Sequence, residues 1–429
     1  MKKMRKIEFL VLYTLFMFFN VENVYSQAAE MRVTSEKMSE ITWWHFWPDG
    51  AGNATINELI AEFEKNNPNV RVKARGLSWD TGHEEVVAVM ELGQPPDILE
   101  LGADMVAEFL FERRLLDITE EINDVKDRYR GWEPVIFENR IYGLPWVLDT
   151  RALYVNKDIL KLAGLDPEIE RNTWEELLTA VRKIHKAKFK NKELTGKYPI
   201  GLNGPERHVL FKKILPFVWS NAADLVSSDG LEVTIDDEKV IEGIKYYLSF
   251  KPYAYVGKQH VLDKMFAEGK IGFWISGSWV INKIEKTNPR LNYRVECIPK
   301  PSPYVERSIS YFGGEYLVIS NTTKFPRECI EFVKFVANRE NTLRFCKNVG
   351  MFFPAIKDAM NDPFYQSESR KKFVEQLSSS KVPPPNKLWM YMKDIFEIEM
   401  GRVINGETEL SDAIKDMKMN INRFFDLFK

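Results

Sequence analysis

The stretch from Tyr142 to Asp158 constrains the fold more than any other part of the chain. Two runs rich in β-branched and aromatic residues meet there at a polar centre, residues 149–151, which predicts two strands with a change of direction between them. Pro145 cannot donate a hydrogen bond to a neighbouring strand, so the first strand is expected to lie at a sheet edge or to end there. The pattern predicts that the chain passes here from one lobe to another, with Trp146 beside the junction.

The residues after this stretch predict the first helices of a second lobe. Asp158 is expected to begin a helix that runs through Leu160. Thr173 and Glu176 have the spacing of a capping box ahead of an apolar stripe, so another helix is expected to begin there. Trp174 lies on the apolar face of that helix and is expected to pack against the core.

At this point the chain resembles extracellular solute-binding protein family 1, the maltose-binding-protein-like substrate receptors of ABC importers. The resemblance rests on the segments YGLPWVLDTRALYVNKDILKLAGLDP and TWEELLTAVRKI, and it continues through PPDILEL, LLDIT and the GSW segment. It implies a type II periplasmic-binding-protein fold, an α/β fold of two lobes. Each lobe is expected to be a mainly parallel sheet flanked by helices, and three crossovers are expected to join the two lobes.

The leading residues have the pattern of a secretory signal peptide. Four of the first six residues are basic, an apolar run follows over residues 7–19, and the segment ends in a small residue, Ser26. The apolar run is too short for a membrane span, which needs about 20 residues. Cleavage near Ser26 is expected to release a protein into the periplasm. Because Gln27 follows and no cysteine is near, a lipid anchor is not expected.

Composition excludes some partners. Lys and Arg total 60 and Asp and Glu total 62, a net charge of −2, which predicts no binding of nucleic acid or of an anionic membrane. About 400 residues exceed what one core usually holds, so two domains are expected. The three cysteines, Cys297, Cys329 and Cys346, have no zinc or redox spacing. Two interpretations stay open: a disulfide between Cys329 and Cys346, or cysteines that are small buried thiols.

The order of predicted elements alternates between strands and helices. Residues 41–47 and 70–77 are predicted strands, and the helix between them carries Ile56, Leu59, Ile60 and Phe63 on one face. Strand, helix and strand in this order predict a parallel sheet with a right-handed crossover. Residues 311–320 are expected to return to this lobe. Lobe 1 is therefore expected at residues 40–149 plus 311–352, and lobe 2 at residues 150–310 plus 353–429.

Sheets of this type bind ligands beyond the carboxyl ends of their strands. That rule and the resemblance select the candidate ligand-binding residues. They are Trp47, Asp49, Trp79, Glu100, Asp104, Trp146, Asp149, Arg207, Trp219, Trp279, Gly314, Glu315 and Trp389. The resemblance implies stacking roles for Trp279 and Trp389, and it puts Asp149 and Glu315 at the crossings. Gly314 is expected to let the backbone approach another body closely.

Each of these residues also has a purely structural interpretation. A tryptophan within a strand is more often core than platform, and one of Trp43 and Trp44 is expected to be buried. Asp49, Glu100 and Asp104 are equally compatible with helix capping. For Trp47, Trp279 and Trp389 their position in loops favours binding.

A sugar is the ligand that this residue set favours. A pyranose has an apolar face that suits flat rings and an equator of hydroxyls that suits charged groups. The predicted function is capture of an oligosaccharide by closure of the two lobes, followed by delivery to the permease of an ABC importer. A monomer without cofactor, metal or catalytic residues is expected. Two alternatives stay open: the same fold binding a polyamine or another small polar solute, and a secreted glycoside hydrolase with a carboxylate pair.

Overall fold

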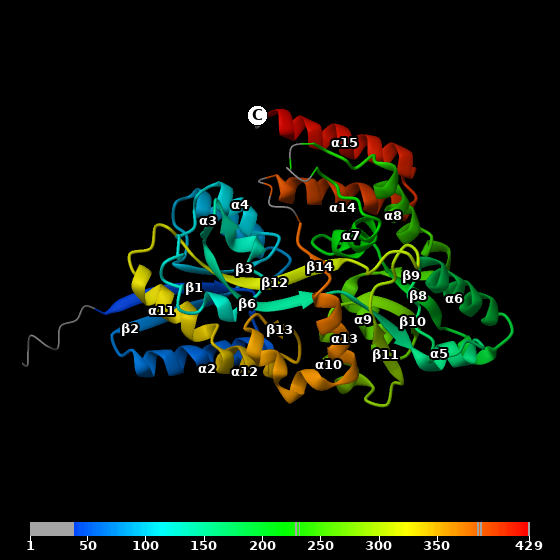
Figure 1. Cartoon of the computed structure of the whole chain (residues 1–429), viewed down its shortest axis with the longest axis horizontal. Helices are drawn as coiled ribbons and strands as arrows, with labels where there is room; N and C mark the ends of the chain where they lie inside the picture. The colour runs from blue at the N-terminus through cyan, green and yellow to red at the C-terminus, as the bar shows by residue number, and fades with distance from the viewer. Residues whose placement is uncertain (1–37, 228–229, 231, 384–385, 387, 428–429) are drawn as a thin grey trace, which may run out of the picture.

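The computed structural model describes residues 38–427, except 228, 229, 231, 384, 385 and 387. The expected signal peptide, residues 1–26, lies outside the described residues. None of the helices in the described part of the chain has the length and hydropathy of a membrane span. The described residues form two large sheets that lie side by side, each flanked by helices (Figure 1), and a small two-stranded sheet of β4 (Ile136–Phe137) and β5 (Arg140–Ile141).

The first sheet combines N-terminal strands with strands that return much later in the sequence. Its order is β13-β6-β12-β3-β1-β2, and β14 pairs with β12 beside this path. The strands are β1 (Ser39–His45), β2 (Val70–Gly76), β3 (Ile98–Gly102), β6 (Gly143–Thr150), β12 (Ser310–Ile319), β13 (Phe353–Pro354) and β14 (Ser380–Lys381). β1 pairs in parallel with β2 and β3, whereas β12 runs antiparallel to β3 and β6. The predicted parallel unit is therefore confirmed.

Helices cover this sheet through the apolar faces that the sequence predicts. They are α2 (Gly50–Asn66), α3 (Gly82–Glu91), α4 (Val106–Phe111), α11 (Pro326–Val336) and α12 (Arg339–Val349). Ile56, Leu59, Ile60 and Phe63 of α2 are all buried. Full burial of such a side chain contributes about 1.5–3 kcal/mol, so this face fixes α2 against the sheet. Trp43 is fully buried and Trp44 is half-buried, as their alternation in β1 predicts.

The second sheet has the order β11-β7-β10-β8-β9. Its strands are β7 (Ala152–Asn156), β8 (Tyr198–Asn203), β9 (Ala254–Gly257), β10 (Ile271–Ser276) and β11 (Tyr293–Glu296). Its helices are α5 (Lys157–Leu162), α6 (Trp174–Ala187), α7 (Leu210–Ser220), α8 (Glu238–Leu248), α9 (Gln259–Ala267) and α10 (Trp279–Thr287). The capping box of Thr173 and Glu176 is present at the start of α6. Trp174 stacks on Tyr246 with ring centroids 4.3 Å apart, which confirms its packing role.

The start of α5 differs from the prediction. Asn156, not Asp158, is the N-cap, because its side-chain oxygen accepts hydrogen bonds from the backbone N–H groups of Asp158 and Ile159 at 3.1 Å. Asparagine satisfies the free N–H groups of a first helical turn as well as aspartate does, so the spacing of the acidic residue was misleading.

The chain passes between the two sheets in three places. β6 leads directly into β7 at Thr150 and Arg151, and β11 leads into β12 over residues 297–309. After β13, α13 (Glu368–Leu377) contacts β11 and β7, and β14 returns to pair with β12. Figure 1 shows β6 and β12 running between the two bodies. Phe353 and Pro354 correct the expected boundary at 353, since β13 pairs with β6 in the first sheet.

Pro145 lies inside β6, and the strand continues through it. It sits opposite Tyr316, where the register of β12 shifts between Glu315 and Tyr316. On the other side of β6, β13 pairs only with Val147 and Leu148. A bulge on one side and a two-residue neighbour on the other let a proline occupy the strand without breaking a sheet ladder.

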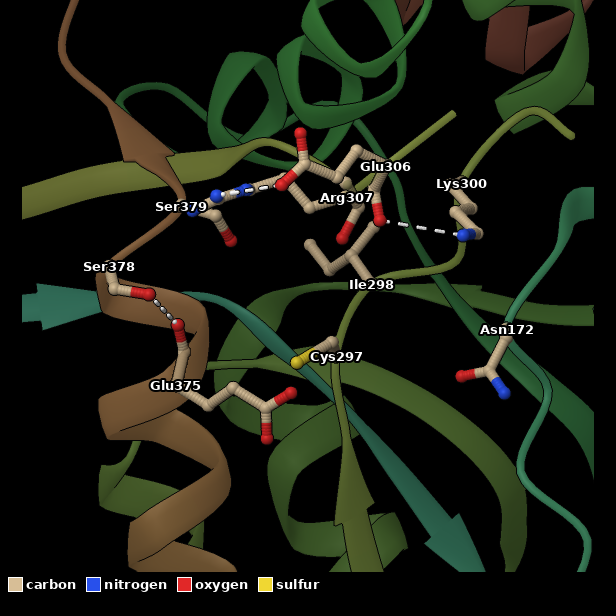
Figure 2. A pocket seen from close by; sticks show the side chains of 10 residues that line it. Asn172, Cys297, Ile298, Lys300, Glu306, Arg307, Glu375, Ser378 and Ser379 are labelled. Atoms are coloured by element: carbon tan, nitrogen blue, oxygen red, sulfur yellow. Dashed lines mark hydrogen bonds and ion pairs between the residues drawn. The ribbon is translucent and has the colours of Figure 1, made fainter. Parts of the chain in front are cut away.

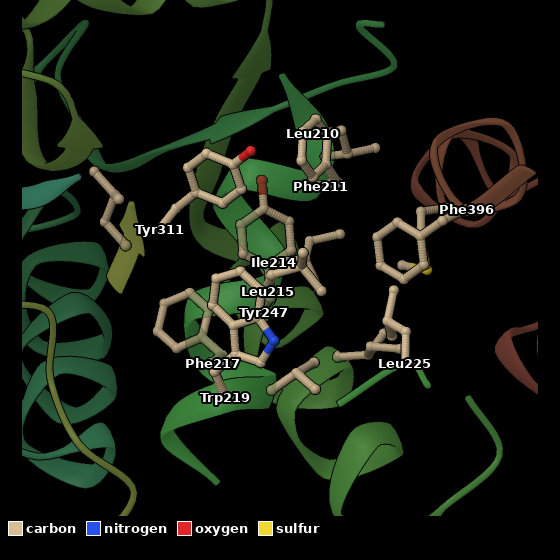
Figure 3. Close-up of a cluster of buried hydrophobic side chains, with 14 of the residues drawn as sticks. Leu210, Phe211, Ile214, Leu215, Phe217, Trp219, Leu225, Tyr247, Tyr311 and Phe396 are labelled. Atoms are coloured by element: carbon tan, nitrogen blue, oxygen red, sulfur yellow. The ribbon is translucent and has the colours of Figure 1, made fainter. Parts of the chain in front are cut away.

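The C-terminal segment forms α14 (Trp389–Asn405) and α15 (Leu410–Leu427), which pack against each other and next to α7. Figure 3 shows the core around α7, where side chains of that helix gather against Leu225, Tyr247, Tyr311 and Phe396. Most of these side chains are less than 2 % exposed. This core holds α7 and α14 in fixed positions, and the first turn of α7 points to the junction between the sheets.

Candidate functional site

A cavity of about 300 Å³ lies between the two sheets. The first lobe lines it with Trp47, Trp79, Asp80, Met105, Asp149 and Glu315. Across from these lie Arg151, Glu206, Arg207, His208, Val209, Lys212, Lys213, Gln259 and Trp279, with Met351 and Phe352 at one side. Trp47, Trp79 and Met105 follow β1, β2 and β3. The carboxyl ends of parallel strands meet at one edge of a sheet, which is why these loops converge.

Trp47 forms one wall and is held at three points. Its Nε1 donates to Glu100 Oε1 at 2.9 Å, and its ring meets Phe345 and Phe352 edge-on at 5.1 and 5.7 Å. Gly52 lies beneath it, where a Cβ atom would come within 2.4 Å of the ring. The half-buried indole is therefore fixed before any ligand arrives.

Trp79 is the more open wall. It stacks on Phe46 with ring centroids 4.3 Å apart and remains 38 % exposed. Phe46 itself is buried, so one face of the Trp79 ring is packed while part of its surface faces the cavity and solvent. Such a ring offers apolar area at little conformational cost.

Trp279 is the wall from the second lobe. It is the first residue of α10, and its Nε1 donates to Asp263 Oδ2 at 2.8 Å. The Arg151 guanidinium lies over its ring, 4.8 Å from the centroid. A Cβ atom at Gly277 would come within 2.0 Å of the same ring, so a glycine is required there.

The floor of the cavity carries buried charges of both signs. Asp149 and Arg151 form an ion pair in which both side chains are nearly buried. Burial and the neighbouring charge of Glu100 raise the pKa of Glu315 well above its usual range, against the opposing effect of Lys212. Burial also raises the pKa of Glu100 to about 8, although the Phe46 N–H and Trp47 Nε1 donate to it. This carboxyl pair therefore retains a proton at neutral pH.

A second group of buried charges lies beside the cavity. Lys212 and Lys393 each approach Asp104 at 3.9 Å. Burial tends to raise the pKa of Asp104, but the charges of these lysines outweigh it and leave the pKa below its usual range. Lys393 Nζ lies 2.7 Å from His208 Nδ1, and burial with the lysine charge lowers the pKa of His208 to about 4. His208 is therefore neutral at physiological pH.

Arg207 connects the two lobes at the rim. Its guanidinium bonds Glu84 of α3 at 2.9 Å and Asp394 of α14 at 3.1 Å. The guanidinium side chain is 57 % exposed, and exposed pairs of this kind contribute only about 0–1 kcal/mol each. The main effect of these two contacts is therefore to hold Arg207 at the mouth of the cavity, and their contribution to the stability of the fold is small.

The structure brings six of the thirteen candidate residues to the cavity and leaves the others elsewhere. Those that line it are Trp47, Trp79, Asp149, Arg207, Trp279 and Glu315. Trp146 is a correction: it is fully buried in β6, where its ring lies 4.4 Å from Phe345 and 6.1 Å from Trp43. A strand residue covered by a helix packs and does not reach a ligand.

Trp219 and Trp389 are also corrections. Trp219 stacks on Tyr311 and donates to Asp224, two helical turns beyond the end of α7 that reaches the cavity. Trp389 is 2 % exposed and meets the ring of Phe211. Both residues belong to the core around α7, so the stacking role implied for Trp389 is not supported by its position.

The remaining candidates lie near the cavity without lining it. Glu100 is inside β3, two residues before the end of the strand, and acts behind Trp47. Asp104 is 5 % exposed and reaches the cavity only through Lys212. Asp49 precedes α2 and is exposed, but its side chain makes no capping hydrogen bond. At Gly314 a Cβ atom would lie 2.6 Å from the Val147 carbonyl oxygen, so its role is the close pairing of β12 with β6.

The candidate set omits several residues that line the cavity. Lys212 and Lys213 lie in the first turn of α7, and Gln259 begins α9. Both helices begin after strands of the second sheet. The rule that ligands bind beyond the carboxyl ends of strands therefore finds these three residues if the search includes the first turn of the helix that follows each strand. His208 has φ +62 in the loop before α7, and that conformation has no sequence signal.

A different hollow lies at the crossover from β11 to β12 (Figure 2), with a volume of about 380 Å³. Figure 2 shows Cys297, Glu375, Lys300 and Glu306 around it. Burial and the charge of Glu375 raise the pKa of Cys297 to about 12, so its thiol stays protonated. The residues that line this hollow include no aromatic ring, which makes it unsuited to a sugar face.

The cysteines and the acidic residues also limit the chemistry. Cys297, Cys329 and Cys346 are all free thiols, and the last two are buried. The open question of a disulfide is thus answered in favour of buried thiols. Among the described residues, no group of three or more His, Cys, Asp or Glu side chains is arranged to hold a metal ion.

Two α/β lobes around a cavity lined from both sides define the class of two-lobed binding proteins. The chain belongs to the family of bacterial extracellular solute-binding proteins, which it matches over residues 58–372. It is 24 % identical to the galactooligosaccharide-binding protein of Bacillus subtilis, over 83 % of this chain and 83 % of that protein. It is 25 % identical to the maltodextrin-binding protein of the same organism, over 85 % and 87 %.

Solved structures share the fold. The GacH receptor of Streptomyces glaucescens, solved unliganded and with acarbose, superposes with a TM-score of 0.78 at 21 % identity, covering 91 % of this chain and 99 % of that one. The maltose-bound MalE3 of T. maritima superposes with a TM-score of 0.76 at 19 % identity, covering 90 % and 100 %. The expected family and the two-lobed periplasmic-binding-protein fold are therefore confirmed.

Proposed function

We propose that this protein is a secreted receptor that captures an oligosaccharide between its two lobes and delivers it to an ABC importer. The observation that carries the proposal is the convergence of three tryptophans with buried charged groups in one cavity: Trp47 and Trp79 from the first lobe and Trp279 from the second. The relatives named for galactooligosaccharide and maltodextrin binding support the choice of ligand class.

The charge balance of the cavity favours a neutral ligand. Three carboxylates line it, those of Asp80, Asp149 and Glu206, against three cationic side chains, those of Arg151, Arg207 and Lys212. Glu315 and Lys213 are left out of this balance, because burial raises the pKa of Glu315 and lowers the pKa of Lys213. A polyamine is best held by an excess of carboxylates, which this balance does not provide. A polyhydroxylated sugar uses both signs, because each hydroxyl donates to a carboxylate and accepts from a cation.

The energetics are adequate for a receptor. A hydrogen bond to a charged group contributes about 1.5–3 kcal/mol, and a stacked ring adds roughly 0.5–1.5 kcal/mol. Three such bonds and two rings offset the cost of ordering the ligand and leave roughly the −8 kcal/mol of a micromolar site. The cavity volume of about 300 Å³ is at the lower end for small-molecule sites.

Closure of the lobes is the proposed mechanism. The crossing at Thr150 and Arg151, the segment before Gly313 and the segment around Gly350 act as hinges, and only the closed form presents both tryptophan walls to one ligand. The proposed lobes are residues 40–149 plus 311–352 and 150–310 plus 353–429, adjusted so that β13 moves with the first sheet. The mature protein is proposed to be a periplasmic monomer, cleaved near Ser26, whose loaded form docks on the permease.

A thermal-shift screen with maltotriose, galactobiose, mannobiose and spermidine tests the proposal. At least one sugar is expected to raise the melting temperature by mass action and to reduce the radius of gyration in small-angle scattering. The sugar recovered after long incubation is expected to be unchanged, whereas new reducing ends would indicate a hydrolase. A shift with spermidine and none with any sugar would contradict the proposal.

A further inference from the structure

Asp263 is a buried residue of α9 that does not line the cavity, yet it holds two residues that do. It is 3 % exposed. Its Oδ1 accepts hydrogen bonds from Trp274 Nε1, Ser276 Oγ and Gln259 Nε2 at 2.8, 2.9 and 2.7 Å. Its Oδ2 accepts from Trp279 Nε1 at 2.8 Å. Trp279 and Gln259 line the cavity.

We propose that Asp263 is the positioning residue that fixes the Trp279 indole as a preorganised sugar platform. This rests on the proposed function of the cavity. One carboxylate oxygen is bonded to three donors of the α9–β10 framework, and the other is bonded to the platform. The platform is thereby tied to the rigid second sheet, although it stands at the start of a helix beside a glycine.

The need for such an anchor follows from the place of Trp279 in the chain. Gly277, two residues before it, offers no side chain to confine the ring, and a Cβ atom there would collide with it. Ser278, the residue before α10, makes no capping hydrogen bond and instead accepts from the Phe352 N–H. The Arg151 guanidinium over the ring is committed to Asp149. The bond to Asp263 is thus what sets the rotation of the indole.

The same carboxylate orients Gln259. Its amide nitrogen donates two hydrogen bonds to protein groups, to Asp263 Oδ1 at 2.7 Å and to Ser276 Oγ at 2.8 Å. The two amide protons are therefore used within the protein, and the carbonyl oxygen is the group that Gln259 has left for a sugar hydroxyl. Asp263 thus determines both the ring and a hydrogen-bond acceptor of this wall.

The variant Asp263→Asn distinguishes the roles of the two carboxylate oxygens. An asparagine has one acceptor oxygen, and the site with three donors retains it, so the amide nitrogen then faces the Trp279 N–H, which has no acceptor. The indole loses its fixed rotation, and the cost of ordering it shifts to the binding step. We expect the dissociation constant for the tightest of maltotriose, galactobiose and mannobiose to rise roughly two- to tenfold.

A double-mutant cycle with Trp279→Phe tests whether Asp263 acts through the indole. Trp279→Phe removes the N–H and keeps a ring, so in that background Asp263→Asn is expected to change the dissociation constant less than about twofold. Trp274→Phe is the matched control, because it removes a bond to Oδ1 without touching Trp279, and it is expected to leave affinity within about twofold. Equal losses of affinity in both Trp279 backgrounds, or an equal loss in the control, would overturn the proposal.

A measurement without ligand makes the test independent of the proposed function. The indole ¹H–¹⁵N resonance of Trp279, assigned by its absence in Trp279→Phe, is expected to exchange slowly with solvent in the wild type. It is expected to shift and to exchange faster in Asp263→Asn, and to be unchanged in Trp274→Phe. If no sugar binds the wild type, the proposed function fails, and an unchanged resonance in Asp263→Asn separately refutes the positioning role.

Discussion

The molecule uses tryptophan in two ways that its sequence does not distinguish. Trp47, Trp79 and Trp279 stand in loops or at a helix start beyond strand ends, and their rings line the cavity between the lobes. Trp146 lies within a strand, Trp219 lies along a helix and Trp389 begins α14, and all three are 4 % exposed or less. The difference is that the first three rings line the cavity whereas the others are covered by neighbouring elements. Position along an element does not separate the groups, since Trp279 and Trp389 both begin a helix. Ring contacts do not separate them either, because rings of both groups pack against other aromatic rings.

The indole N–H groups are bonded in different ways within each group, and Trp219 of the buried group donates to Asp224 at 3.0 Å. Trp47 and Trp279 donate to buried carboxyl groups, those of Glu100 and Asp263. Among the described residues, the N–H groups of Trp146 and Trp389 find no hydrogen-bond partner. At Trp47 and Trp279 the bond sets the rotation of a ring that is only half-buried, whereas close packing alone can fix a fully buried ring. Because only the first group lines the cavity, we propose ligand binding for Trp47, Trp79 and Trp279 and a packing role for the second group.

The largest effect is expected for Trp389→Ala. Removal of a fully buried tryptophan leaves a cavity in the core between α14 and α7, and the free energy of unfolding is expected to fall by about 3–5 kcal/mol. Affinity for the sugar is expected to stay within about threefold, because the ring does not line the cavity. Urea denaturation and calorimetric titration at a temperature where the variant is folded measure the two quantities. A large loss of affinity with unchanged stability would move Trp389 to the other group.

A smaller effect is expected for Glu100→Gln, which changes the support of Trp47. The pKa of Glu100 is raised from 4.5 to about 8 on folding. Between these two pH values the folded state therefore keeps a proton on Glu100 that the unfolded state has lost. Stability from this group is fully present below pH 4.5 and is lost as pH rises to about 8. The variant is expected to flatten that decline, which is of order a few kcal/mol. Unfolding free energies from pH 5 to 8 measure it.

The control for this variant is Glu58→Gln, on the exposed side of α2. This variant makes the same chemical change at an exposed carboxyl group and leaves Glu100 in place, so the decline of its stability with pH is expected to match that of the wild type. An equally steep decline in Glu100→Gln would mean that Glu100 is ionised at neutral pH in the folded protein.

The local part of this organisation is readable from the sequence. The capping box at Thr173, the apolar face of α2 and the passage at residues 149–151 depend on neighbours in sequence, and the structure contains all three. The positions of Trp47 and Trp279 follow from the same kind of reasoning, because a loop after a strand end has a known direction relative to its sheet.

The missed parts depend on distant neighbours. Trp389 is buried by Phe211, which lies 178 positions earlier in the chain, and no local pattern encodes that contact. Glu100 was placed after a strand that in fact ends at Gly102, and an error of two residues moves a side chain from the cavity to the layer behind it. Lys212 reaches the site because the core around α7 orients the first turn of the helix, which is a tertiary effect.

Trp47→Ala is expected to reduce affinity and stability together. The ring packs edge-on against Phe345 and Phe352 and also lines the cavity. We expect the dissociation constant to rise about tenfold or more, and the free energy of unfolding to fall by roughly 2–3 kcal/mol, less than for a fully buried ring. Titration and urea denaturation of one preparation give both numbers. Affinity equal to the wild type would place Trp47 with the structural group.

The smallest effect, and the cleanest test of the comparison, is expected for Trp79→Ala. Trp79 stacks on Phe46 and is 38 % exposed, so its loss creates no closed cavity and the free energy of unfolding is expected to change by less than about 1 kcal/mol. A stacking contact of about 0.5–1.5 kcal/mol predicts a two- to tenfold rise in the dissociation constant. Trp132→Ala is the matched control, since Trp132 is half-buried beside Tyr129 and does not line the cavity. If both variants bind sugar equally well, exposure at a strand end is not sufficient to make a tryptophan part of the site, and Trp79 leaves the binding group.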